Sequence, residues 1–279
     1  MKPSEIQSDF FTEHGYLVIE NFFDPKAIEA IRKKIQKIIQ IVASVYGVDL
    51  PERDDFNSFT DLDLLCGADL ATENRKALGD VYDAIKQIPE FMQLVTSESN
   101  FRLFSSLRGT SMPGLAANSY GIRIDLPGDS KYSTFWHQDF HSQLRSLNGV
   151  VFWTPVVRVT PDLGPVQILD KSHLLGPVAT YDDNSDGRSG PYSLRLVGEP
   201  ELVQRFQTVE PLLNIGDLLL MDFNLIHCSG VNASNRGRWS IQFRLFDYLD
   251  EVGQQILWTG SFASGVKFEK LFAHLKVNE

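Results

Sequence analysis

The chain has 279 residues, of which 43% are hydrophobic and 22% charged, and its formal net charge at pH 7 is −10. Nucleic acids and anionic membranes are bound through clustered Lys and Arg side chains, and the basic residues here are scattered, so neither is expected as a partner. The composition is that of a globular protein with a sizeable core, and no run approaches the roughly 18 apolar residues of a membrane span.

The cysteines and the first residues of the chain indicate the cellular compartment of the protein. Cys66 and Cys228 form no CxxC pair and no disulfide framework, which fits a reducing environment. The first 20 residues contain one early Lys and no apolar segment of a signal peptide, which argues against secretion. A cytoplasmic location is therefore expected.

The N-terminal part is predicted to be mainly helical. A short strand is expected over 16–23, and a helix follows over 24–47, because Asp24 is a favourable N-cap and Gly47 can adopt the left-handed conformation that ends helices. Isoleucines at helical spacing give this helix one apolar face to bury. A second helical region is expected over 71–95.

After about residue 118 the pattern changes to short β-rich runs separated by turn residues. The predicted strands cover 119–126, 132–140, 149–159, 165–169, 216–223 and 238–248. A long polar interval over about 176–205 interrupts them, as functional lids and disordered segments do. We expect one domain over 1–279, with helices to about residue 117 and a β core over about 118–250.

Residues 135–141, "FWHQDFH", place two histidines and a carboxylate within five positions. On a strand, His137 and Asp139 would point to the same face about 6.6 Å apart, close enough to bind one metal ion. His141 would lie about 13 Å from His137, too far to join them, and is expected to line a pocket or the surface. A His-x-Asp pair is weak evidence alone, so a third ligand is required.

His227 is the candidate for the missing third ligand, and Arg238 is a further candidate residue of the site. His227 follows the apolar run 216–223, and Arg238 begins a strand in which polar and apolar residues alternate. The polar face of that strand would hold Arg238, Ser240, Gln242 and Arg244. Such a face is normally exposed to solvent, although inside a barrel with a polar cavity it could point inward.

Taken together, these motifs resemble the phytanoyl-CoA dioxygenase-like family of Fe(II)/2-oxoglutarate-dependent oxygenases. The resemblance extends over "GYLVIENFFDPKAIEAIR", "HQD", "GPVQILDKSH" and "GDLLLMDFNLIHCSGVNASNRGRWSIQFR". It implies a mainly β fold with flanking helices, in which N-terminal helices pack on a double-stranded β-helix (jelly-roll, cupin-like) core. It also implies Fe(II), 2-oxoglutarate as co-substrate, and O₂.

Within the resemblance, His137, Asp139 and His227 correspond to the iron ligands. Two imidazoles and one carboxylate leave three positions on an octahedral ion open, two for the 2-oxo acid and one for O₂. Arg238 corresponds to the partner of the far carboxylate of 2-oxoglutarate, a role for which a bidentate guanidinium is suited. Ser229 matches a position whose hydroxyl helps bind that carboxylate, and Ser240 competes for this role.

Two further positions correspond to residues close to 2-oxoglutarate in the family. They are Trp153 in "VFWTPV" and His173 in "DKSH". A core tryptophan and a histidine that caps a turn are the competing interpretations.

Other residues near the motif are candidates for contacts with the substrate. Arg123 and Asp125 precede the His-x-Asp segment and match positions that contact co-substrate or substrate, although a surface ion pair explains them more simply. Phe140 and His141 are expected to face the substrate or the cavity rim. Asp139 itself favours hydroxylation, because halogenating relatives lack this carboxylate.

The function expected is oxidation of a small polar molecule, such as a sugar derivative or a natural-product intermediate. The polar interval suits such a substrate through Tyr181, Asp182, Asp183, Arg188, Tyr192 and Arg195, unless it is a disordered surface loop. The net charge disfavours a polyanionic acyl-CoA. A zinc-dependent hydrolase with the same ligands and a non-catalytic jelly-roll binding protein are the alternatives, and the oligomeric state is not predicted.

Overall fold

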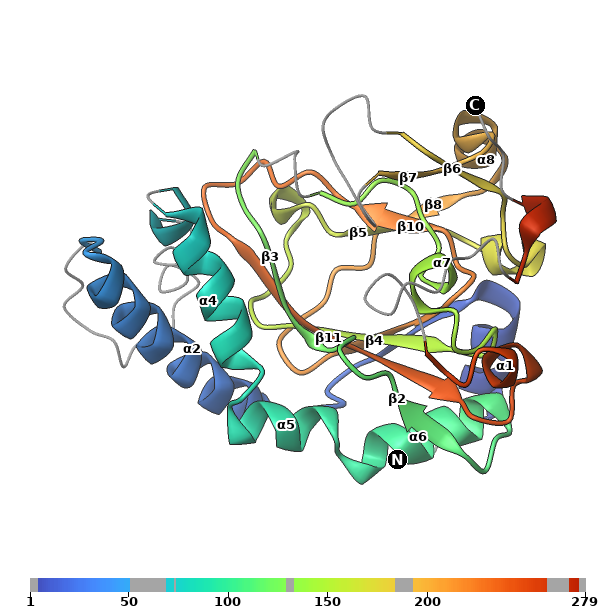
Figure 1. Ribbon diagram of the computed structural model, residues 1–279, viewed down its shortest axis with the longest axis horizontal. Coiled ribbons are helices and arrows are strands. Elements are labelled where there is room, and N and C mark those ends of the chain that lie inside the picture. Colours follow the sequence, from blue (N-terminus) through green and yellow to red (C-terminus); the bar gives the residue numbers. More distant parts are fainter. Residues whose placement is uncertain are drawn as a thin grey trace.

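The protein is described here by a computed structural model, which covers residues 5–50, 69–72, 74–128, 133–183, 193–259 and 271–275. Its centre is a larger antiparallel sheet in the order β1-β9-β4-β11-β2, with β3 also paired to β11 (Figure 1). These strands are β1 (Tyr16–Ile19), β2 (Pro113–Leu115), β3 (Gly121–Asp125), β4 (Val150–Pro155), β9 (Leu218–Asp222) and β11 (Arg238–Asp247).

A smaller sheet and a hairpin complete the strands. The smaller sheet has the order β10-β5-β8, and the hairpin joins β6 to β7; all pairings are antiparallel. Their bounds are β5 (Val166–Leu169), β6 (Thr180–Asp182), β7 (Leu194–Leu196), β8 (Thr208–Val209) and β10 (His227–Ser229).

Helices lie mainly in the N-terminal part, along one side of the larger sheet (Figure 1). They are α1 (Glu5–His14), α2 (Pro25–Tyr46), α4 (Arg75–Ile85), α5 (Pro89–Val95) and α6 (Glu98–Arg108). The later helices are short: α7 (Phe140–Gln143), α8 (Glu199–Arg205) and α9 (Glu251–Gln255). Turns of 3₁₀ helix occur at Pro161–Leu163, Ser172–Leu175 and Ala273–Leu275. No described helix is both long enough and apolar enough to cross a membrane.

Alternation along β11 divides the core into two layers. Trp239, Ile241, Phe243 and Leu245 are fully buried in the layer shared with the N-terminal helices. The opposite face contains Arg238, Ser240, Gln242 and Arg244, and it points into the space between the two sheets, where three of these residues line a cavity. The polar face of β11 therefore points inward. The sequence had allowed either this orientation or exposure to solvent.

The helix predicted over 24–47 is confirmed as α2. The Asp24 carboxylate accepts a hydrogen bond from the Lys26 backbone N–H at 2.9 Å, and Gly47 ends the helix at φ 65°. The N-terminal part is not only helical, because β1 pairs with β9 and β2 pairs with β11. Helices α1 and α6 were not predicted.

Two predicted segments differ from the structure. The strand expected over 132–140 is wrong: its described part contains only an isolated bridge at His137, and the chain enters α7 at Phe140. The polar interval 176–205 is not simply a loop, since it contains β6, β7 and α8. Arg188 and Tyr192 lie outside the described residues.

The stacked rings of Phe152 and Phe243 allow a test of how much the packing on β11 contributes to stability. The rings lie 4.9 Å apart on neighbouring strands, and both are fully buried. We expect Phe243→Ala to lower the free energy of unfolding by about 3–5 kcal/mol in denaturant titrations. The exposed Val45→Ala should change it by no more than about 0.5 kcal/mol, and an equal loss in both variants would contradict this packing.

Candidate metal centre

An antiparallel bridge brings His137 and His227 face to face. Each backbone N–H donates to the carbonyl of the other residue at 3.0 Å. Residues paired in this way have Cα atoms about 5.5 Å apart with side chains on the same face of the sheet. The two imidazole rings accordingly lie 4.3 Å apart between their centroids.

Asp139 joins the histidines because the chain turns, not because it continues as a strand. Its backbone is helical, with φ −64° and ψ −26°, and its carbonyl accepts hydrogen bonds from Ser142 and Gln143 in the first turn of α7. The turn is fixed from outside by a bond of 2.9 Å from the Phe140 N–H to the Phe223 carbonyl. The Asp139 carboxylate thereby comes within 3.8 Å of His137 Nε2.

The donor atoms suit a single metal ion. One ligand atom each from His137, Asp139 and His227 all lie within 4.8 Å of one another, and no other such group occurs among the described residues. Each imidazole Nδ1 hydrogen-bonds a backbone carbonyl, that of Phe135 at 2.8 Å and that of Leu225 at 2.9 Å. Nδ1 must then be the protonated nitrogen, which leaves each Nε2 lone pair for a metal.

The charge states also fit metal binding. Burial lowers the pKa of His137 to about 3, with the neighbouring His227 adding to the shift, and burial lowers the pKa of His227 too. Burial alone would raise the pKa of Asp139, but Arg244 and the two histidines hold it at about 2. Neutral imidazoles and an ionised carboxylate are the forms that coordinate a metal.

Arg244 is a site residue that the sequence did not single out. Its Nε donates to Asp139 Oδ2 at 3.1 Å, and its side chain is 18% exposed. Alternation had placed Arg244 on the same face of β11 as Arg238, which was a usable signal. Only the turn at Asp139, absent from the prediction, shows that the two side chains meet.

Arg238 lies in a buried charge cluster that the register of β3 and β11 creates. Asp125 is directly opposite Arg238, and the Asp125 Oδ2 accepts from Arg238 Nη2 at 2.8 Å. Arg123 also pairs with Asp125, at 2.8 Å. Although burial raises the pKa of Asp125, the two guanidinium groups bring it to about 2. The expected surface ion pair is thus largely buried and includes a third member.

A small cavity of about 60 Å³ separates Arg238 from the histidines. Its walls include His137, His227, Trp153 and Ser229. Arg238 is 1% exposed, and its Nη1 has no hydrogen-bond partner within the described part of the chain. A buried guanidinium N–H without a partner is costly, so this atom fits an anionic group bound in the cavity.

The two candidate serines differ in position. The Ser229 hydroxyl lines the small cavity, receives a hydrogen bond from Arg123 at 3.1 Å and lies 3.0 Å from the Thr134 hydroxyl. Ser240 is fully buried beside the cavity, not in its wall, and accepts from Gln242 at 3.4 Å. This geometry favours Ser229 for contact with a ligand in the cavity.

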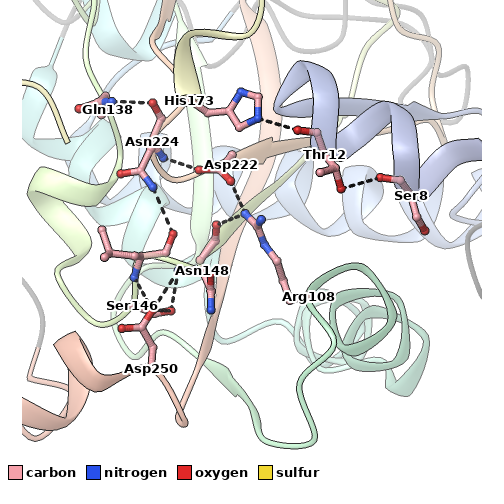
Figure 2. Close-up of polar contacts among 12 residues, drawn as sticks. Ser8, Thr12, Arg108, Gln138, Ser146, Asn148, His173, Asp222, Asn224 and Asp250 are labelled. Carbon is pink, nitrogen blue, oxygen red and sulfur yellow. Dashed lines mark hydrogen bonds and ion pairs between the residues drawn. The ribbon is translucent and has the colours of Figure 1, made fainter. Parts of the chain in front are cut away.

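Two predicted contacts, His173 and Phe140, are placed differently, and a third, His141, lines a cavity as expected. His173 is not near the small cavity: its Nε2 bonds the Thr12 carbonyl at 3.0 Å on α1 (Figure 2). Phe140 does not face a cavity, because it is fully buried in the core beside Phe272. His141 does line the larger cavity, and its Nε2 donates to the Val178 carbonyl at 2.8 Å.

A larger cavity, of about 440 Å³, also adjoins the candidate metal ligands. His137, Arg123 and Arg244 line both cavities, and Asp139 lines the larger one. Its wall is completed by α7 and by the β6–β7 hairpin, with Phe135, Trp136, Ser142, Gln143, Thr180, Leu194 and Arg195. The candidate ligands therefore line two spaces of different size.

Comparison with known proteins identifies the family. The family model described as phytanoyl-CoA dioxygenase (PhyH) matches residues 11–240, most of the chain. The chain belongs to the phytanoyl-CoA dioxygenase family. Membership confirms the expected enzyme class, a 2-oxoglutarate-dependent oxygenase, and disfavours both a zinc hydrolase and a non-catalytic binding protein.

Solved structures with a similar fold support the predicted architecture. The epimerase SnoN from nogalamycin biosynthesis, in complex with Fe³⁺, α-ketoglutarate and nogalamycin RO, has a TM-score of 0.60 at 16% identity, with 91% of this chain and 88% of SnoN covered. The carbocyclase SnoK from the same biosynthesis has a TM-score of 0.57 at 17% identity, covering 88% and 84%. EctD from S. alaskensis with 2-oxoglutarate and 5-hydroxyectoine gives 0.55 at 18%, covering 88% and 76%. The predicted jelly-roll core with flanking helices is confirmed.

Buried neutral histidines make the metal-free protein sensitive to acid. His141 is buried and its pKa is lowered to about 4, so with His137 and His227 the folded state binds fewer protons than the unfolded state below pH 6.5. The free energy of unfolding should therefore fall as pH falls from 6.5 towards 4, by up to about 1.4 kcal/mol per pH unit for each imidazole.

Denaturant titrations of chelator-treated protein between pH 7 and 5 measure this dependence. His141→Gln removes one of the titrating groups and should reduce the slope, whereas the exposed His274→Gln should leave it unchanged. Equal slopes in the wild type and in His141→Gln would contradict the assignment.

Proposed function

We propose that the protein holds Fe(II) with His137, Asp139 and His227, binds 2-oxoglutarate against Arg238, and oxidises a small polar metabolite. The observation that carries the proposal is the buried Nη1 of Arg238, which has no hydrogen-bond partner among the described residues, on a side chain that lines the small cavity together with the histidine pair. An anion that reaches from the metal to this guanidinium needs two separated acidic ends. 2-Oxoglutarate has a 2-oxo acid at one end and a carboxylate at the other.

The side chains have separable tasks. Bound iron supplies the redox chemistry that couples decarboxylation of 2-oxoglutarate to succinate with oxidation of the substrate. Arg238, oriented by Asp125, pairs with the far carboxylate, and the Ser229 hydroxyl adds a hydrogen bond. Arg244 holds the Asp139 carboxylate ionised and oriented through Oδ2, which leaves Oδ1 towards His137 and the metal.

The larger cavity is suited to the substrate. Its lining contains the amide of Gln143, the hydroxyl groups of Ser142 and Thr180, and the aromatic rings of Phe135 and Trp136. Such a wall suits a molecule with polar edges and one apolar face, such as a sugar derivative or a natural-product intermediate. The structural neighbours crystallised with nogalamycin RO and 5-hydroxyectoine contain ligands of comparable kind.

Turnover of the co-substrate tests the proposed reaction. With Fe(II), O₂ and a library of polar metabolites, the wild type should convert 2-oxoglutarate to succinate, faster with a substrate than without. His137→Ala should abolish this conversion while the protein stays folded, and His274→Ala should not affect it. Succinate formation that is supported by zinc alone would contradict the proposal.

Arg238 is expected to set the affinity for 2-oxoglutarate. Arg238→Lys retains the charge but loses the planar pair of donors, so the KM for 2-oxoglutarate should rise about 10-fold or more. The exposed Arg158→Lys is the matched control. An unchanged KM in Arg238→Lys would exclude Arg238 as the anchor.

A further inference from the structure

Gln138, the middle residue of the His-Gln-Asp motif, bonds backbone groups of other segments and lies between two candidate ligands in the sequence. It is 1% exposed, and its side-chain amide makes three hydrogen bonds to backbone groups. Nε2 donates to the Gly176 carbonyl at 2.8 Å and to the Asn224 carbonyl at 2.5 Å, and Oε1 accepts from the Val178 N–H at 2.8 Å. One buried side chain therefore joins its own segment to two others, at 176–178 and at Asn224.

The bond to Asn224 reaches the turn that leads into His227. This turn is itself fixed, because the Asn224 N–H donates to Asp222 Oδ1 at 2.7 Å and Arg108 of α6 pairs with the same carboxylate (Figure 2). The Asn224 side chain also donates to the Leu147 carbonyl at 3.2 Å. Gln138 thus connects the turn that contains Asp139 to the turn that precedes His227.

The bonds to Gly176 and Val178 reach the segment that leads into β6. The hairpin that starts there places Thr180 and Arg195 in the wall of the larger cavity. His141, one turn along α7, donates to the Val178 carbonyl and adds a second attachment. The start of the hairpin is therefore connected directly to the segment that carries two of the three candidate ligands.

We propose that Gln138 is a positioning residue that couples metal binding to the order of the β6–β7 hairpin. The inference rests on the proposed metal centre. Metal coordination fixes His137 and Asp139, which fixes the backbone between them and hence the Gln138 amide that holds the start of the hairpin. Coupling of this kind is reciprocal, so a well-ordered hairpin also raises the affinity for the metal.

Two properties separate this role from a purely structural one. If Gln138 served only the packing of the core, its replacement would lower the stability of the metal-free protein and leave the metal affinity unchanged. A positioning residue changes metal affinity itself, typically by 10–100-fold for groups that orient ligands. A positioning residue also makes hydrogen–deuterium exchange in the hairpin depend on whether the metal is bound.

The experiment uses Co²⁺ alone as the probe, added to full-length protein. Calorimetry gives its Kd, and hydrogen–deuterium exchange with and without Co²⁺ follows peptides over 176–183 and 193–197. The variants are Gln138→Met, which keeps the size but none of the hydrogen bonds, and Gln138→Glu, which keeps the acceptor for the Val178 N–H. Gln87→Leu, on the surface, is the control.

In the wild type, Co²⁺ should slow exchange in the hairpin peptides. In Gln138→Met the Kd should rise about 10–100-fold and the metal-dependent protection should disappear, with Gln138→Glu intermediate and Gln87→Leu unchanged. If Gln138→Met does not fold, an intermediate Kd and partial protection in Gln138→Glu support the proposal, and wild-type values in Gln138→Glu overturn it.

A folded Gln138→Met with wild-type Kd and wild-type protection would overturn the coupling. His137→Ala distinguishes this result from failure of the metal centre. Co²⁺ binding that is lost in His137→Ala but retained unchanged in Gln138→Met refutes only the role of Gln138. Binding that survives in His137→Ala refutes the metal centre and the coupling that rests on it.

Discussion

The reciprocal backbone pair between His137 and His227 is the interaction on which the site depends. Two segments far apart in sequence are held with their imidazoles 4.3 Å apart, and both Nδ1 atoms are occupied by carbonyls of the same chain. Two neutral imidazoles, one buried and one half-buried, gain little from such close contact alone. The proposed metal ion accounts for it, and the third donor from Asp139 completes a set of two imidazoles and one carboxylate.

One buried arginine, Arg238, and two half-buried ones, Arg123 and Arg244, surround this centre, and each is placed by strand register. Arg238 and Arg123 share Asp125, and Arg244 pairs with Asp139, so the cost of removing each charge from water is offset locally. The cavity walls also contain Arg195, stacked on the Phe135 ring at 3.5 Å. The net charge of −10 therefore does not describe the field that a substrate meets inside the protein.

Much of the fold could be predicted from local signals. The caps at Asp24 and Gly47 defined α2, and the alternation in β11 correctly separated the helix-packed face from the inward polar face. The candidate ligands could be named because their residue types and order matched a family motif. Their geometry could not, since the segment 132–140 has the aromatic and β-branched residues of a strand, yet it turns at Asp139.

The predictions that were wrong concern residues whose positions depend on long-range contacts. The turn at Asp139 is held by the Phe223 carbonyl, which no local pattern reveals. The same turn rotates Phe140 into the core and brings Arg244 to Asp139. His173 lies against α1, a helix that was not predicted, so its partner Thr12 could not be foreseen.

Anaerobic titration with Fe(II) and then 2-oxoglutarate tests the central claim most directly. A 2-oxo acid that chelates Fe(II) gives a visible charge-transfer absorption band. The wild type should develop this band at one equivalent of each ligand, and His227→Ala should not. A band of equal intensity in His227→Ala, or none in a wild type that binds Fe(II), would contradict it.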